Sequence, residues 1–183
     1  MGKRLTLILG GARSGKSEFA QALARQRGGD DVLFVATAEA LDDEMRARIR
    51  DHRAARPAGW RTLQAPRRIA GEMLPASERV VLVDCMTLWV SNVLLAEENT
   101  ATEVMLQELG ELLEWYRAAR CEMIVVSNEV GMGIVPDNAL GRAYRDLLGM
   151  VNKRIAEVAD EVFLLVAGVP MEVKSRRARL EEL

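Results

Sequence analysis

The chain has 183 residues, of which 49% are hydrophobic and 28% charged, and its formal net charge is −2. This length suits a single domain with one core, and the composition excludes a disordered or fibrous protein. The balanced charge provides no basic field for phosphate backbones, so no nucleic acid partner is expected.

The expected elements alternate along the chain between short apolar strands and longer helices. The patterns predict strands at residues 5–9, 32–36, 80–83, 123–127 and 162–166, and helices at 16–27, 41–53, 86–95, 102–119 and 139–159. An edge strand at 169–174 is compatible with the pattern, whereas residues 60–78 show no regular one. Apolar strands alternating with helices are typical of a parallel sheet covered on both faces. The predicted fold is therefore a doubly wound, mostly parallel α/β domain over residues 1–174, followed by a charged tail at 175–183.

The location of the protein is predicted from its apolar runs and its cysteines. The first apolar run, residues 5–9, is too short for a signal peptide or a membrane span, so no membrane span is expected. The two cysteines, Cys85 and Cys121, and the single histidine do not form a disulfide framework or a zinc-binding spacing. The sequence therefore predicts a cytoplasmic protein.

A glycine-rich segment connects the first predicted strand to the first predicted helix. It matches the pattern G-x-x-x-x-G-K-[ST] and consists of Gly10, Gly11, Ala12, Arg13, Ser14, Gly15, Lys16 and Ser17. Glycines there let successive backbone N–H groups face phosphate oxygens, and the positive end of the helix adds to the attraction. Lys16 is expected to reach the β and γ phosphates, and the Ser17 hydroxyl to bind Mg²⁺. The segment predicts a P-loop that binds a nucleoside triphosphate with Mg²⁺; the alternative is a glycine-rich turn without a ligand.

Asp84 follows the apolar run at residues 80–83 and is the second predicted magnesium ligand. A carboxylate at the end of a central strand beside a P-loop is where the metal is expected. The alternative is an N-cap for the helix at 86–95, a position that Asp also favours.

His52 is the only histidine and lies on one stripe of the predicted helix with Leu41, Met45 and Ile49. One interpretation is a core histidine with a hydrogen-bond partner. The other is a catalytic imidazole, since the neutral ring has a nitrogen that can attack phosphorus. The residues alone leave both open.

Several segments together resemble one enzyme family. Besides the P-loop they are Ala36-Thr37, Leu41-Asp-Asp-Glu-Met45, Arg48-Ile49-x-x-His52-x-x-x-Arg56-Pro57, Trp60-Arg61-Thr62 and Ser127-Asn-Glu-Val-Gly-Met-Gly-Ile-Val-Pro136. From residue 5 to about residue 174 the chain is similar to the bifunctional adenosylcobinamide kinase/adenosylcobinamide-phosphate guanylyltransferase family. Many families share the P-loop, and the other segments in this order are far more specific.

The resemblance implies two activities and a homotrimer. Adenosylcobinamide would be phosphorylated with ATP or GTP, and GMP would then pass from GTP to adenosylcobinamide phosphate. It also implies that His52 carries the guanylyl group as an intermediate and that Ala38, Glu39 and Arg56 lie in nucleotide-contacting segments. From the residues alone, Arg56 could equally be a surface charge.

Three features around this resemblance remain open. Relatives often have Glu in place of Asp84 and Gln64, so magnesium geometry or base recognition can differ here. Asn128 and Glu129 follow a strand's carboxyl end, where open α/β sheets bind ligands, and we assign them to the corrinoid side; a structural turn is the alternative.

Two other functions are compatible with a P-loop. One is a single-activity metabolite kinase, in which His52 has no catalytic role. The other is a GTP-binding regulatory switch, which the absence of an Asn-Lys-x-Asp segment argues against.

Overall fold

The structure is a computed structural model that describes residues 2–39, 43–54, 56–73, 76–97 and 99–178. Within helix α2 (Asp43–Ala54), the side chains of residues 44, 45, 48, 51 and 52 lie outside this description.

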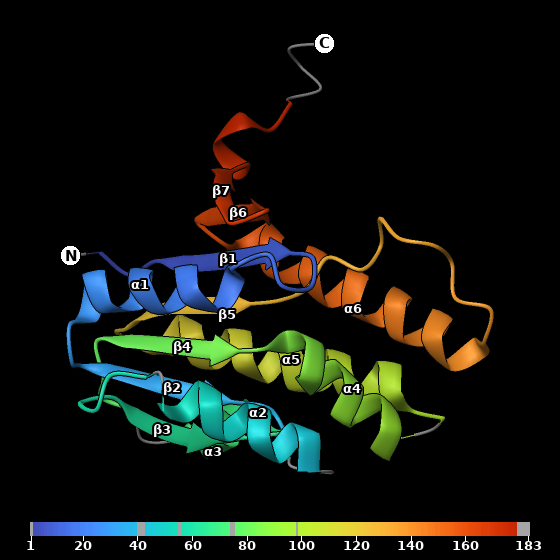
Figure 1. The fold of residues 1–183 in the computed structure, drawn as a ribbon, viewed down its shortest axis with the longest axis horizontal. Helices are drawn as coiled ribbons and strands as arrows, with labels where there is room; N and C mark the ends of the chain where they lie inside the picture. The colour runs from blue at the N-terminus through green and yellow to red at the C-terminus, as the bar shows by residue number, and fades with distance from the viewer. Residues whose placement is uncertain (1, 40–42, 55, 74–75, 98, 179–183) are drawn as a thin grey trace.

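The described strands form one seven-stranded sheet with the order β3-β2-β4-β5-β1-β6-β7 (Figure 1). Their bounds are β1 (Leu5–Gly10), β2 (Val32–Ala36), β3 (Arg61–Gln64), β4 (Val80–Asp84), β5 (Glu122–Val126), β6 (Glu161–Val166) and β7 (Val169–Glu172). All neighbouring pairs are parallel except β6 and β7, which form an antiparallel hairpin. The predicted mostly parallel α/β fold is confirmed.

Helices cover both faces of this sheet. Helix α1 (Lys16–Gly28) packs on β1, β2, β4 and β5, and α2 lies on the same side (Figure 1). Helices α4 (Met86–Ala96), α5 (Ala101–Ala118) and α6 (Ala139–Val158) pack against one another on the opposite face, where the short α3 (Ile69–Glu72) contacts α5. The doubly wound arrangement is the predicted one.

The apolar strands are continuous because alternate residues enter two separate cores. In β4, Val81 and Val83 belong to the core beneath α4, α5 and α6, whereas Val80 and Leu82 belong to the core beneath α1. All four side chains are fully buried. A strand buried on both faces has no polar alternation, which is why the sequence pattern indicated a parallel sheet.

The region of residues 60–78 differs from the prediction, because it contains β3 and α3. Arg61 and Thr62 are exposed and only Leu63 is half-buried, so β3 has no apolar run to detect. Backbone pairing defines this edge strand instead, from Leu33 opposite Arg61 to Ala36 opposite Gln64.

The end of the described chain is close to expectation. The edge strand predicted at 169–174 is confirmed as β7, and a 3-10 turn follows at Lys174–Arg176. Residues 179–183 of the predicted tail lie outside the described residues, and the boundary at 174 stays a prediction. No described helix has the length and apolar character needed to cross a bilayer.

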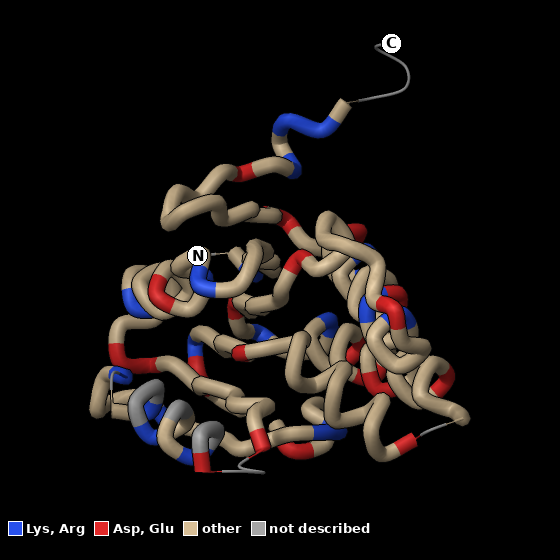
Figure 2. The backbone as a smooth tube through the Cα atoms, turned by 45° about the vertical axis from the view of Figure 1, so that its right-hand side comes forward, with Lys and Arg blue, Asp and Glu red and all other residues tan. Residues whose placement is uncertain are grey.

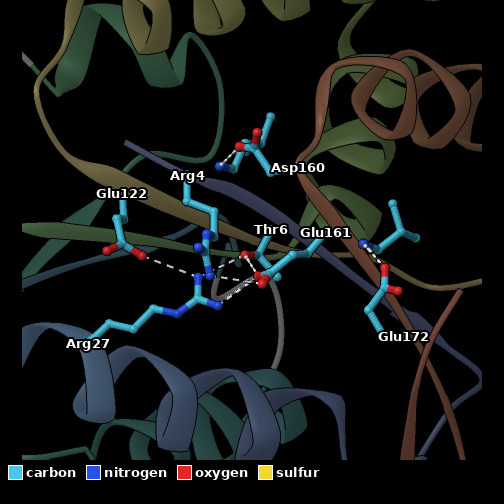
Figure 3. A network of polar contacts seen from close by, with 9 residues as sticks. Arg4, Thr6, Arg27, Glu122, Asp160, Glu161 and Glu172 are labelled. Carbon is cyan, nitrogen blue, oxygen red and sulfur yellow. Dashed lines mark hydrogen bonds and ion pairs between the residues drawn. The ribbon is translucent and has the colours of Figure 1, made fainter. Parts of the chain in front are cut away.

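A buried ionic network joins α1 to the amino ends of three strands (Figure 3). The Arg27 guanidinium lies 2.7 Å from Glu161 and 3.2 Å from Glu122, and it donates a 2.9 Å hydrogen bond to Thr6 Oγ1. These residues come from β1, β5 and β6, so the network holds the amino edge of the central sheet together. In the backbone view, blue and red segments are spread over the fold, as the balanced charge of the sequence implies (Figure 2).

Candidate active site

A pocket of about 520 Å³ opens at the carboxyl ends of the central parallel strands. Its walls come from residues 12–18 of the phosphate loop and from residues at or after the ends of β2, β3, β4 and β5. Open α/β sheets bind ligands at this edge, and the volume is within the usual range for small-molecule sites. The predicted P-loop therefore lies at the pocket of the fold.

Two glycines give the phosphate loop its shape. Gly15 precedes α1 with a left-handed φ of 87°, a conformation that suits glycine. A Cβ on Gly10 would lie 2.6 Å from the carbonyl oxygen of Leu165 on β6. Close contact at one position and backbone angle at the other thus explain why glycine is needed at both.

Lys16 is held inside the site by the loop itself. Its side chain is almost fully buried, and Nζ donates to the Gly11 carbonyl oxygen at 2.6 Å and to Ser14 Oγ at 3.4 Å. Burial lowers the pKa of Lys16 below its usual 10.5, although nearby Cys85, Asp84 and Glu18 raise it. Phosphate oxygens would exchange for these neutral acceptors and stabilise the charged ammonium.

Ser17 and Asp84 both line the pocket and fit a magnesium site. Asp84 ends β4, opposite Ala36 on β2 and Val126 on β5. Mg²⁺ prefers oxygen ligands and usually keeps waters and substrate phosphates beside one or two protein groups, which a hydroxyl and a carboxylate would match. No group of three or more His, Cys, Asp or Glu side chains suited to a metal occurs among the described residues, which also favours a shared site of this kind.

The alternative role of Asp84 as an N-cap does not fit the geometry. The N-cap of α4 is Cys85, and no side chain caps that helix end. Burial raises the pKa of the Cys85 thiol to about 11, so the thiol stays protonated and is not a nucleophile at neutral pH.

Arg56 places a second cation in the pocket, and the interpretation of this residue as a surface charge is not supported. Its guanidinium carbon lies 3.5 Å from the centroid of the Phe34 ring, a cation–π contact. Burial lowers the pKa of Arg56, whereas Asp84 raises it and Arg53 lowers it further. The buried Nε has no hydrogen-bond partner within the described structure, so it remains available to an anionic ligand.

A hydrogen-bonded clasp holds the ends of β2 and β4 together beside Asp84. Thr37 Oγ1 donates to the Cys85 carbonyl oxygen at 2.7 Å and accepts from the Cys85 N–H at 2.8 Å. From α4, Asn92 Nδ2 donates to the Thr37 carbonyl oxygen at 2.8 Å. The clasp fixes the backbone on both sides of the predicted metal carboxylate.

The structure brings most of the predicted nucleotide residues together and adds others. Residues 12–17, Ala38, Arg56 and Asp84 line the pocket, whereas Gly10, Gly11 and Glu39 are not among its described lining residues. The predicted nucleotide contacts of these three stay predictions.

Sequence reasoning missed Phe34, Thr87 and Leu88 in the lining, and it left Gln64 out of the site. Gln64 Nε2 donates to the Ala38 carbonyl oxygen. Their position at or just after strand ends was the available signal. Asn128, which we assigned to the corrinoid side, also lines this pocket, and its N–H donates to Thr87 Oγ1 at 3.0 Å.

His52 lies in α2, but its side chain lies outside the described residues, as does residue 41 of the predicted stripe. Ile49, three residues earlier on the same helix, lines the pocket. Helix α2 therefore borders the site, and the choice between a core and a catalytic histidine is not made by the described contacts.

A family model described as cobinamide kinase / cobinamide phosphate guanyltransferase matches residues 6–173. The chain belongs to this family. The predicted family is thus confirmed, and with it the prediction of an enzyme of the transferase class.

Curated relatives agree over nearly their whole lengths. The bifunctional adenosylcobalamin biosynthesis protein CobP of Pseudomonas aeruginosa is 45% identical, with 92% of this chain and 96% of the relative covered. The protein of the same description named CobU from Salmonella typhimurium is 42% identical, with 93% and 99% covered.

Similarity to solved structures supports the fold alone. The RadB recombinase has a TM-score of 0.50 at 20% identity, covering 88% of this chain and 73% of that one. The ATPase domain of another protein has the same TM-score of 0.50 at 13% identity, covering 90% of this chain and 69% of that one.

Proposed function

We propose that this member of the family phosphorylates adenosylcobinamide with ATP or GTP and then transfers GMP from GTP to adenosylcobinamide phosphate. The products of the second reaction are adenosylcobinamide-GDP and pyrophosphate. The observation that carries the proposal is the family match over residues 6–173, whose curated relatives are described as bifunctional adenosylcobalamin biosynthesis proteins.

In the kinase reaction, the hydroxyl oxygen of adenosylcobinamide attacks the γ phosphorus and the bond to the β-phosphate oxygen breaks. Charge then builds on that leaving oxygen, beside the amino end of α1. Lys16 and the N–H groups of the phosphate loop stabilise this charge. Ser17 and Asp84 would hold Mg²⁺, which, when bound, neutralises charge on the phosphate oxygens.

In the guanylyl transfer, a neutral nitrogen of His52 attacks the α phosphorus of GTP. A P–N bond forms as the bond to pyrophosphate breaks, and the second ring nitrogen loses its proton. A phosphate oxygen of the substrate then attacks the same phosphorus, the P–N bond breaks and the imidazole recovers a proton. Support comes from the resemblance around His52 and from the position of α2, whose Ile49 lines the pocket.

Arg56 is proposed to stabilise charge at the α phosphate and the departing pyrophosphate. The available Nε and the rigid stacking on Phe34 suit this role, since a guanidinium held in place loses little entropy on binding. The homotrimer and the cytoplasmic location remain proposals that rest on the resemblance and on the sequence.

The guanylyl intermediate is tested with GTP labelled at the α phosphorus. Wild-type protein should acquire an acid-labile label, and His52→Ala should acquire none while still phosphorylating adenosylcobinamide. Arg50→Ala, which alters an exposed side chain of the same helix, is the matched control and should label normally.

Three results would contradict the proposal. A wild-type protein that phosphorylates the corrinoid but never labels would be a single-activity kinase. A His52→Ala protein that labels like the wild type would exclude the histidine. Slow GTP hydrolysis that is unchanged by corrinoid, with no product formed from it, would favour a regulatory switch.

A further inference from the structure

The phosphate loop lies between the pocket and the hairpin formed by β6 and β7. In the sheet order, β5, β4 and β2 lie on one side of β1, and β6 and β7 lie on the other (Figure 1). The other sheet strands that line the pocket all belong to the β5 side. The loop that leaves β1 therefore has the pocket on one side and the hairpin on the other.

The hairpin contacts the loop through backbone atoms. The N–H of Gly168, in the turn between β6 and β7, donates to the Ser14 carbonyl oxygen at 3.1 Å. A Cβ on Gly15 would lie 3.4 Å from the Cα of Gly168. The turn thus packs directly against the middle of the phosphate loop.

This hydrogen bond determines which way one peptide group faces. The Ser14 carbonyl and the Gly15 N–H belong to the same planar trans peptide and point in opposite directions. Because the carbonyl faces Gly168, the N–H faces away from the hairpin, on the side of the pocket. Glycine permits several orientations of such a peptide, and rotation would turn the carbonyl oxygen toward bound phosphates.

The turn adopts an unfavourable conformation in order to make this contact. Val166 pairs with Val169, so the turn has two residues, Ala167 and Gly168, with φ of 50° and 82°. Two-residue turns with both angles positive favour Asn-Gly or Gly-Gly, and alanine is disfavoured at the first position. A Cβ on Gly168 would meet no atom within 4 Å, so backbone conformation, rather than crowding, favours glycine there.

We propose that the turn at residues 167–168 is a positioning element of the phosphate site, in which the Gly168 N–H holds the Ser14–Gly15 peptide so that the Gly15 N–H faces the β phosphate. Gly168 acts through the loop and touches no reacting atom. The inference rests on the proposed function only in that the pocket binds a nucleoside triphosphate.

The test is an insertion of two residues, Ser-Gly, between Ala167 and Gly168, which moves the turn away from Ser14. Longer turns on exposed hairpins are tolerated well, so the protein is expected to fold. Dissociation constants for GTP and GMP are measured by calorimetry, because GMP lacks the β phosphate. We expect GTP to bind roughly tenfold to a hundredfold more weakly, as for the loss of one hydrogen bond to a charged group, and GMP to change by less than about twofold.

Two controls separate positioning from simple destabilisation. Ala167→Asn keeps the two-residue turn with a residue that accepts a positive φ, and it should bind GTP like the wild type. The same insertion between Gly29 and Asp30, exposed residues at the amino end of β2, should leave both affinities unchanged. If the turn insertion does not fold, an ester in place of the Gly168 amide, introduced by semisynthesis, removes the same donor.

The outcomes are distinguishable. An unchanged GTP affinity in the insertion or ester protein would overturn the inference. Equal losses for GTP and GMP would also overturn it, because they would indicate a structural role only. A wild-type protein that binds neither nucleotide would instead overturn the proposed function.

Discussion

Arg27→Met removes the cation at the centre of the network that joins α1 to the amino ends of β1, β5 and β6. Methionine has a similar length and apolar character along the helix, so the change deletes the charge more than the packing. The side chains of Arg27 and Glu122 are only 12% and 10% exposed, and that of Glu161 is 24% exposed. The substitution therefore leaves two largely buried carboxylates without their shared counter-ion.

The size of the effect follows from this burial. Removing one partner of a buried ion pair costs about 3–5 kcal/mol, because the remaining charge stays desolvated. For a chain of this length each kcal/mol lowers the melting temperature by about 2–4 °C, so a decrease of about 6–20 °C is expected. Arg4→Met is the matched control, because Arg4 contacts Glu161 from a half-exposed position, where an ion pair contributes about 0–1 kcal/mol.

The assay is urea unfolding followed by circular dichroism at neutral pH, together with GTP binding to the folded variant. Nucleotide affinity should be unchanged, since the network lies at the opposite end of the strands from the pocket. A loss of stability under about 1 kcal/mol for Arg27→Met, or one equal to that of Arg4→Met, would refute the reasoning.

Three further predictions concern the site and the acid range. Asp84→Asn should raise the Mg²⁺ concentration needed for half-maximal kinase activity roughly tenfold, because an amide lacks the ligand charge; an unchanged Mg²⁺ titration would contradict this. Arg56→Lys keeps the charge but loses the planar stacking on Phe34, so GTP affinity measured by calorimetry should fall roughly tenfold, whereas equal affinities would exclude the contact. Although burial opposes ionisation, hydrogen bonds from Arg27 and Thr6 and the charges of Arg27 and Arg4 lower the pKa of Glu161 below 4.5. The stability contributed by its charge is present above pH 4.5 and lost as the pH falls through the lowered pKa, so wild type and Glu161→Gln should converge in urea midpoint there; a constant difference would contradict the shift.

Local patterns in the sequence were enough to predict the central sheet, the phosphate loop and the ligand-binding edge. Strands such as β2 and β4 are buried on both faces and have continuous apolar runs, and α1 begins directly after the spaced glycines. Asp84 was recognisable because a carboxylate after such a run must lie at the end of a central strand. These features depend on neighbouring residues, which is why they needed no knowledge of the tertiary structure.

Tertiary structure alone decided the features that join distant segments. β3 exists through backbone pairing with β2, and its exposed side chains carry no signal. Phe34 and Arg56 are 22 positions apart in the numbering and are stacked only because α2 and the following loop return across the carboxyl end of β2. Likewise, the contact of Gly168 with Ser14 requires β6 to lie beside β1. Sequence periodicity reports which faces of an element are buried, whereas the partner of each face is selected by packing across the whole chain.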